Sequence, residues 1–135
     1  MPFVELTEEH HVGVSMIDDQ HMRLAEMINK LYDSMQSGID TEEVRVLINA
    51  VVGYIEYHFD EEEQYMLRTN YPEAGEHKRM HISLRKQIQE IKRGLDIDRG
   101  AMPLSILDFL RNWLLNHIQT WDVKLGQTVK SRVPV

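Results

Sequence analysis

Side chains that bind metal ions recur in this sequence at spacings that favour a buried metal site. His58 precedes Glu62 by four residues, and His77 precedes His81 by four. Residues four apart share one face of an α-helix, so each pair would aim two metal-binding groups in the same direction. Three further candidates complete the set: His21, His117 and Asp122.

The composition limits which kind of metal site is available. The chain has 135 residues, 42% hydrophobic and 27% charged, which suits a single domain with one core. It contains no cysteine, so disulfides, zinc–thiolate sites, iron–sulfur clusters and thiol nucleophiles are excluded. Histidine nitrogen and carboxylate oxygen remain as the ligands for a metal ion.

The net charge narrows the choice of partners. A formal charge of −7 argues against nucleic acid and against an anionic membrane, because both are bound through basic surfaces. The N-terminus lacks the basic stretch and apolar run of a secretion signal, and no later apolar run is long enough to span a bilayer. We therefore expect a soluble, cytoplasmic protein.

The apolar periodicity predicts an all-α protein. Residues 1–16 show no helical period and favour an extended N-terminal arm. A first helix is expected to begin at a cap formed by Asp18 or Asp19 and to stop at Gly38. Thr41 favours the start of a second helix, and Pro72 suits the start of a third. The expected helices span about 18–37, 41–70, 72–94 and 103–126.

These helices predict an up-down-up-down antiparallel four-helix bundle that forms one domain over residues 1–135, with a bundle at 17–126 and a tail or linker at 127–135. Antiparallel alternation brings all seven candidate ligands to one end of the bundle. Seven groups exceed the six positions of one first-row ion, whereas carboxylates that bridge two ions would accommodate them all. His117 and Asp122 lie five residues apart, so both face the core only if the helix ends there or carries a π-bulge.

Four motifs together resemble a bacterial hemerythrin domain. They are Ile17-Asp18-Asp19-Gln20-His21, then His58-Phe59-Asp60-Glu61-Glu62, then His77-Lys78-Arg79-Met80-His81, and Trp113-Leu114-Leu115-Asn116-His117-Ile118 followed by Asp122. Each motif is weak evidence alone, but all four occur in the order and spacing of that family, and the resemblance extends from Gly13 to about Leu125.

The resemblance implies a non-haem di-iron centre, with two iron ions joined by an oxo or hydroxo group, that binds dioxygen reversibly at an open iron position. It also implies a protein that is not an enzyme and has no catalytic residues. One iron would be coordinatively filled, and its histidine ligands would be His77, His81 and His117. The iron with the open position would take His21 and His58, and Glu62 and Asp122 would bridge the pair.

The surroundings of the site are also predicted. By resemblance, four apolar residues would line the oxygen pocket: Phe59, Trp113, Leu114 and Ile118. A metal-bound imidazole usually donates its second N–H, and the candidate acceptors are Asp18, Gln20 and Asn116. We expect the acidic neighbours of Glu62 to be solvated, and His10 and His11 to lie at the surface.

Three functions remain open at this point. The first is oxygen storage, carriage or delivery, with dioxygen as the partner. The second is an oxygen- or redox-sensing module attached to a signalling output domain, since hemerythrin domains also occur in signalling proteins; assembly as a homo-oligomer is open as well. The third is a scavenger of peroxide or nitric oxide, which ranks last because no acid–base residue besides the ligands is evident near the site. Slow autoxidation would favour carriage, and fast autoxidation would favour sensing.

Overall fold

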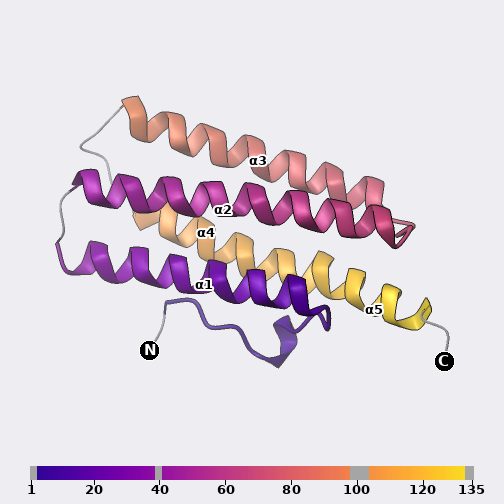
Figure 1. The fold of residues 1–135 in the computed structure, drawn as a ribbon. Helices are drawn as coiled ribbons and strands as arrows, with labels where there is room; N and C mark the ends of the chain where they lie inside the picture. The colour runs from indigo at the N-terminus through magenta and orange to yellow at the C-terminus, as the bar shows by residue number, and fades with distance from the viewer. Residues whose placement is uncertain (1–2, 39–40, 98–103, 133–135) are drawn as a thin grey trace.

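Four long helices form an antiparallel bundle in the computed structural model, which describes residues 3–38, 41–97 and 104–132 (Figure 1). They are α1 (Ser15–Gln36), α2 (Thr41–Arg68), α3 (Ala74–Ile97) and α4 (Leu104–His117). The last helix continues through a π-helical turn, η2 (Ile118–Asp122), into α5 (Val123–Arg132). Within the described residues there is no β-strand. The predicted all-α four-helix bundle is thereby confirmed.

Apolar stripes of the helices meet along the bundle axis. Leu24, Ile28 and Leu31 repeat at three- and four-residue spacing on α1 and are completely buried, as is Ile55 on α2. This spacing places an apolar face of each helix against its neighbours. Among the described helices, none is both long enough and apolar enough to cross a membrane.

The first helix begins earlier than the sequence suggested. We expected Asp18 or Asp19 to cap it, but α1 starts at Ser15, with Val14 preceding its first turn. The Asp18 carboxylate instead accepts hydrogen bonds from the backbone N–H groups of Val12 and Gly13, at 2.8 and 3.0 Å. Asp18 therefore ties the arm to the helix, and this alternative use of a carboxylate near a helix start explains the error.

The turn between α2 and α3 also differs from expectation. Asn70 adopts a positive φ of 52° after the end of α2, and Pro72 lies in the turn rather than in the helix. The backbone N–H of Ala74 donates to the carbonyl of Tyr71, and α3 begins at Ala74. This helix also continues through Gly94 to Ile97. The predicted helix start at Pro103 lies outside the described residues.

The C-terminal segment is helical as far as Arg132 rather than ending near Gly126. Leu125 is completely buried, and Val129 packs against the core, so this part of the chain carries more apolar contact than its polar composition indicated. Gly126 faces the arm: a Cβ placed on it would lie 2.1 Å from the carbonyl oxygen of Val12. The absence of a side chain allows the arm to approach α5 closely.

The substitution Gly126→Ala should therefore displace the arm. We expect it to lower the free energy of unfolding by about 1–3 kcal/mol, the usual cost of overpacking, and to speed proteolysis of residues 3–14. The control is Gly53→Ala, because nothing lies within 4 Å of a Cβ at that position in α2. It should stabilise the protein by about 0.5–1 kcal/mol, the helix preference of alanine over glycine. Equal stability of the two variants would show that the arm does not depend on this approach.

Candidate metal centre

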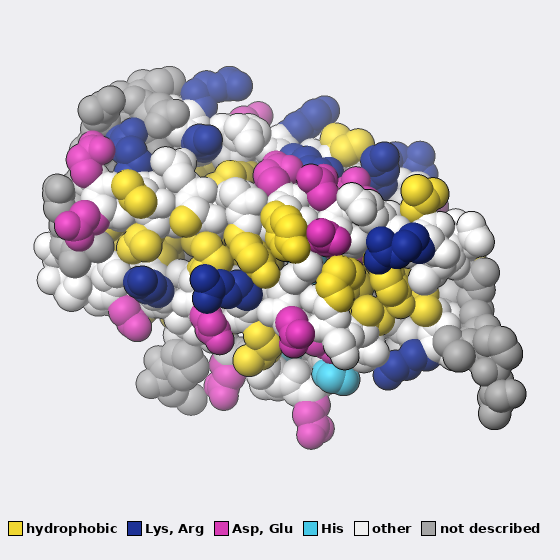
Figure 2. Space-filling view, viewed as in Figure 1, with side chains coloured by type: hydrophobic (Ala, Val, Ile, Leu, Met, Phe, Trp, Pro, Cys, Tyr) yellow, Lys and Arg dark blue, Asp and Glu magenta, His cyan; other side chains and the backbone are white. Residues whose placement is uncertain are grey.

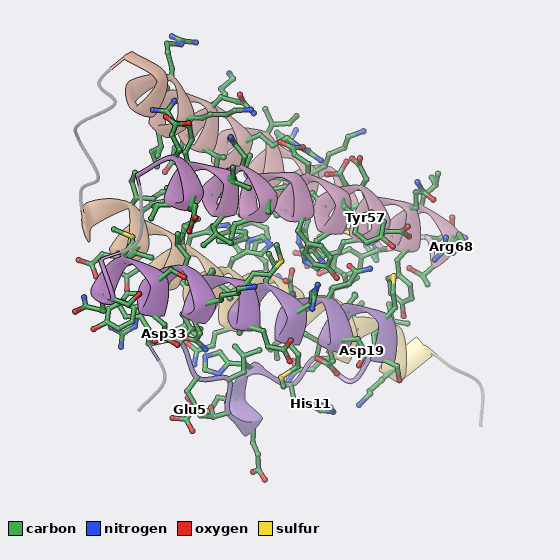
Figure 3. The ribbon with its side chains drawn as sticks, turned by 60° about the vertical axis from the view of Figure 1, so that its left-hand side comes forward. Glu5, His11, Asp19, Asp33, Tyr57 and Arg68 are labelled. Carbon is green, nitrogen blue, oxygen red and sulfur yellow. The ribbon has the colours of Figure 1, made fainter. Side chains whose placement is uncertain are left out.

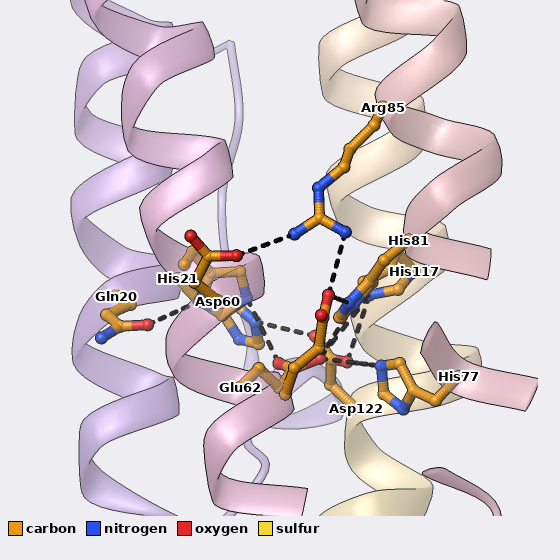
Figure 4. Close-up of polar contacts among 11 residues, drawn as sticks. Gln20, His21, Asp60, Glu62, His77, His81, Arg85, His117 and Asp122 are labelled. Carbon is orange, nitrogen blue, oxygen red and sulfur yellow. Dashed lines mark hydrogen bonds and ion pairs between the residues drawn. The ribbon is translucent and has the colours of Figure 1, made fainter. Parts of the chain in front are cut away.

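All seven predicted ligands lie together inside the bundle, and none is more than 5% exposed. Each of the four helices contributes to the cluster, and η2 supplies the last residue (Figure 4). Burying five imidazoles and two carboxylates is costly unless each group finds a partner. The residues, in chain order, are His21, His58, Glu62, His77, His81, His117 and Asp122.

The cluster divides into two groups of potential ligands, each with its ligand atoms within 4.8 Å of one another. One group contains three histidines and a carboxylate: His77, His81, His117 and Glu62. The other contains two histidines and two carboxylates: His21, His58, Glu62 and Asp122. We refer to them as the three-histidine group and the two-histidine group.

Glu62 reaches both groups through its two oxygens. Its Oε1 lies 2.7 Å from His77 Nε2 and 3.1 Å from His81 Nε2. Its Oε2 lies 3.3 Å from His58 Nε2. A carboxylate placed in this way can supply one oxygen to each of two neighbouring ions.

Asp122, at the end of η2, also reaches both groups through its two oxygens. Its Oδ1 lies 3.0 Å from His77 Nε2 and 3.2 Å from His117 Nε2, and its Oδ2 lies 2.9 Å from His21 Nε2. The π-helical turn η2 makes this possible, because its wider turn carries Asp122 back to the inner face that His117 occupies. Of the two expected alternatives, a helix end and a π-bulge, the structure shows the π-bulge.

The buried polar atoms of the cluster fit a metal ion better than they fit one another. The four oxygens of Glu62 and Asp122 are buried without a hydrogen-bond partner. The Nε2 atoms of His21, His58 and His77 are also buried without a hydrogen-bond partner. Atoms that converge without pairing, in a set made of imidazole nitrogen and carboxylate oxygen, are what first-row transition metals bind.

Burial and the opposite charges of the cluster shift the pKa values of its carboxyl groups and imidazoles in opposite directions. Burial opposes ionisation of Glu62, yet the charge of His58 and its neighbours holds the pKa of that carboxyl well below its ordinary value. Burial disfavours protonated His77, but Asp122 and Glu62 raise its pKa to about 9. Burial also disfavours protonated His117, but Asp122 and Glu62 together have the larger effect and raise the pKa of His117 to about 10. A metal ion has to displace these protons, so its binding should weaken as the pH falls.

One predicted acceptor for a histidine N–H is found, and one acceptor was missed. The Oε1 of Gln20 lies 2.7 Å from His58 Nδ1, as predicted (Figure 4). The Oε2 of Glu63 lies 2.9 Å from His81 Nδ1 and is only partly exposed, so the expectation that the acidic neighbours of Glu62 are solvated is wrong for Glu63. Burial opposes its ionisation, but the hydrogen bond from His81 lowers the pKa of Glu63 below its ordinary value.

The two other residues predicted to accept a histidine N–H lie in different surroundings. Asp18 holds the arm, as described above, and Asn116 is exposed on α4. Asn116 lines a cavity of about 390 Å³ beside α3 and α4. A single helix motif does not reveal which partner a flanking polar residue chooses, because that choice depends on the neighbouring helix.

The four residues predicted to line the oxygen pocket are all buried, and two of them, Phe59 and Trp113, lie beside histidines of the cluster. Phe59 stacks on the ring of His81, with centroids 4.0 Å apart, and lies 6.1 Å from that of His58. Trp113 lies beside His117 at 6.2 Å and lines the 390 Å³ cavity. Leu114 and Ile118 are no more than 1% exposed.

The two histidines of the arm differ from each other. His10 was expected at the surface, but it is 92% buried and its Nδ1 accepts a hydrogen bond from the backbone N–H of Thr7. This local bond closes the short 3-10 helix η1 (Glu8–His10). His11 is exposed as expected, and Figure 3 shows it on the outer side of the arm.

Comparison with known proteins identifies relatives along nearly the whole chain. A family model described as "Hemerythrin HHE cation binding domain" matches residues 12–129. The bacteriohemerythrin of Stenotrophomonas maltophilia is 32% identical over 126 residues, which cover 93% of this chain and 81% of that protein. The bacteriohemerythrin of Clostridium acetobutylicum is 29% identical over 119 residues, covering 85% of this chain and 92% of that protein.

Solved structures agree with the sequence relatives. The crystal structure of a wild-type hemerythrin matches with a TM-score of 0.85 at 27% identity, over 93% of this chain and 97% of that one. The crystal structure of a hemerythrin variant with a leucine replaced by alanine matches with a TM-score of 0.87 at 26% identity, over 96% and 98% of the two chains.

The contact between Gln20 and His58 gives a test of metal binding on the two-histidine side. Replacing Gln20 with methionine keeps the side-chain length but removes the acceptor, so the His58 ring loses its fixed orientation. We expect the affinity of the two-histidine group for a metal ion to fall by about 10–100-fold, as when similar outer partners are removed. The measurement is a competition with a chelator. Gln36→Met, at an exposed position near the end of the same helix, should leave the metal affinity unchanged.

Proposed function

The chain belongs to the hemerythrin family, and we propose that it holds two iron ions, one in each group, and binds dioxygen reversibly at the iron of the two-histidine group. Members of this family are non-haem iron proteins, and the two groups of buried ligand atoms found here fit such a site. Iron in this setting would supply electrons to dioxygen on binding and recover them on release.

A single observation carries this proposal: two buried carboxylates each place one oxygen near the histidines of one group and the other oxygen near the histidines of the other group. Glu62 lies between His77 and His58, and Asp122 lies between His117 and His21. Two bridging carboxylates keep two ions close together. The ligand set that we propose is therefore the complete cluster: His21, His58, Glu62, His77, His81, His117 and Asp122.

The two groups differ by one imidazole, and this difference supports an open position. With shared carboxylates and a shared oxo or hydroxo bridge, the three-histidine group can fill six positions around its iron. The two-histidine group lacks one nitrogen donor, so its iron retains one free position. A diatomic ligand requires one such position.

The protein around the cluster favours binding over turnover. Phe59, Leu114 and Ile118 are buried, and Phe59 stacks on His81; we propose that together with Trp113 they line the oxygen pocket and keep water out of it. In the described part of the chain, the only buried carboxyl groups are those of Glu62 and Asp122, both committed to the cluster. A site without a spare proton donor is poorly equipped for acid–base catalysis, so we propose a non-enzymatic role.

The direct test is anaerobic reduction of the purified protein followed by admission of air, with metal analysis and visible spectra at each stage. We expect about two irons per chain, one for each group, and an absorption band that appears with air and disappears when oxygen is removed. A protein that keeps only zinc, or that shows no reversible band, would contradict the proposal. The lifetime of the oxygenated form separates storage or carriage, which need a long lifetime, from sensing, which suits a short one.

Glu62 should be indispensable for holding both ions. Glu62→Ala removes one of the two carboxylates shared by the groups and leaves Asp122 as the only carboxylate bridge. We expect iron content to fall from two per chain to one or fewer, measured after reconstitution and gel filtration. Glu61→Ala, which removes the same charge from the adjacent position on α2, should retain both irons. Two irons in the Glu62 variant would show that the bridging assignment is wrong.

A further inference from the structure

A cluster of charged residues lies at the Nδ1 edge of His81, outside the proposed ligand set. Its centre is Arg85 on α3, whose guanidinium contacts three carboxylates of α2: Glu56 at 2.8 Å, Glu63 at 3.0 Å and Asp60 at 3.1 Å. Figure 4 shows Arg85 reaching across from α3 to Asp60, above the clustered histidine and carboxylate side chains. Each nitrogen of the guanidinium donates to a different carboxylate, so the position of Arg85 is fixed by three hydrogen bonds, unlike that of a single surface ion pair.

Helix register places this cluster next to the site. The three carboxylates are spaced by four and three residues, so they share one face of α2. Arg85 follows His81 by four residues and therefore lies one turn farther along the same face of α3. The two faces meet because α2 and α3 are antiparallel neighbours (Figure 1).

Glu63 connects Arg85 to the proposed metal ligand. One of its oxygens, Oε2, lies 3.0 Å from Arg85 Nη1 and 2.9 Å from His81 Nδ1. His81 Nε2 faces Glu62, at 3.1 Å, so the two ring nitrogens serve different partners. The Phe59 ring supports the guanidinium, whose Cζ lies 5.1 Å from the ring centroid, within the range of a cation–π contact.

We propose that Arg85 is a positioning residue for the metal centre: it holds the Glu63 carboxylate on the Nδ1–H of His81, and thereby fixes the ring so that Nε2 points to the ion of the three-histidine group. This inference rests on the proposed function, because it takes His81 as a ligand. An anchored acceptor keeps the proton on Nδ1, fixes the ring plane and strengthens the imidazole as a donor to the metal.

The geometry requires arginine rather than a positive charge alone. The planar guanidinium directs separate N–H groups to Glu56, Asp60 and Glu63 at the same time. A lysine ammonium is a compact charge on a flexible stem and does not reproduce that planar fork. Arg85→Lys therefore separates the effect of position from the effect of charge.

The experiment compares Arg85→Met, Arg85→Lys, Glu63→Gln and the double variant Arg85→Met/Glu63→Gln with the unaltered iron-loaded protein. We expect Arg85→Met and Glu63→Gln to release one iron to a chelator about tenfold faster, the lower end of the range for lost outer partners. Both should raise the reduction potential, because a weaker imidazole donor stabilises the ferric state less. The double variant should match Glu63→Gln, and Arg85→Lys should resemble Arg85→Met. The control is Arg79→Met, at an exposed position of the same helix.

Several outcomes would overturn the proposal. They are an unchanged release rate and potential in Arg85→Met, a double variant whose effect is the product of the two single effects, and full recovery in Arg85→Lys. A second readout does not need iron: exchange of the His81 Nδ1 proton with solvent, followed by NMR in the metal-free protein. It should speed up in Arg85→Met but not in Arg79→Met. If the unaltered protein binds no iron, the proposed function fails, while this exchange rate still decides whether Arg85 positions His81.

Discussion

The structure depends on one electrostatic constraint, the burial of two carboxylates and five imidazoles in the same interior space. Glu62 and Asp122 are both inaccessible to solvent, and their oxygens face histidine nitrogens without completing hydrogen bonds. Such groups are expensive to bury; protonated histidines offset part of this cost at the carboxylates, and a metal ion at the centre of the cluster would offset more of it. The apolar stripes of the helices close around this cluster, so a bound metal would stabilise the fold as well as react with a ligand.

The rest of the chain is shaped to bring these groups together. A π-helical turn returns Asp122 to the inner face of its helix, although five residues separate it from His117. Gly126 lets the arm lie against α5 at Val12, and Asp18 holds the arm at the same point by accepting hydrogen bonds from the backbone N–H groups of Val12 and Gly13. On the face drawn in Figure 2, acidic and basic side chains are interspersed around a band of apolar side chains that runs along the middle of the molecule.

The sequence predicted the bundle and brought the seven candidate ligands to one end because helical periodicity is a local property. It also indicated that the last helix either ends or carries a π-bulge after His117, because His117 and Asp122 cannot share a face of a regular helix, and the structure shows the π-bulge. The sequence did not predict the partners of polar side chains that can form hydrogen bonds either within their own segment or with a distant one. Asp18 serves the arm instead of capping α1, His10 turns inward to Thr7, and Glu63 finds His81 and Arg85 across the helix interface. The sequence pattern of one helix does not indicate which of these partners a side chain will contact.

The two halves of the centre differ in their supporting residues as well as in their ligands. His58, in the two-histidine group, is oriented by the neutral amide of Gln20, whereas His81, in the three-histidine group, is oriented by the charged Glu63. A carboxylate acceptor makes an imidazole a stronger donor than an amide does, so the three-histidine ion would be the more firmly held. Firm ligation on one side and an open position on the other would let one ion stay fixed while the other exchanges a ligand.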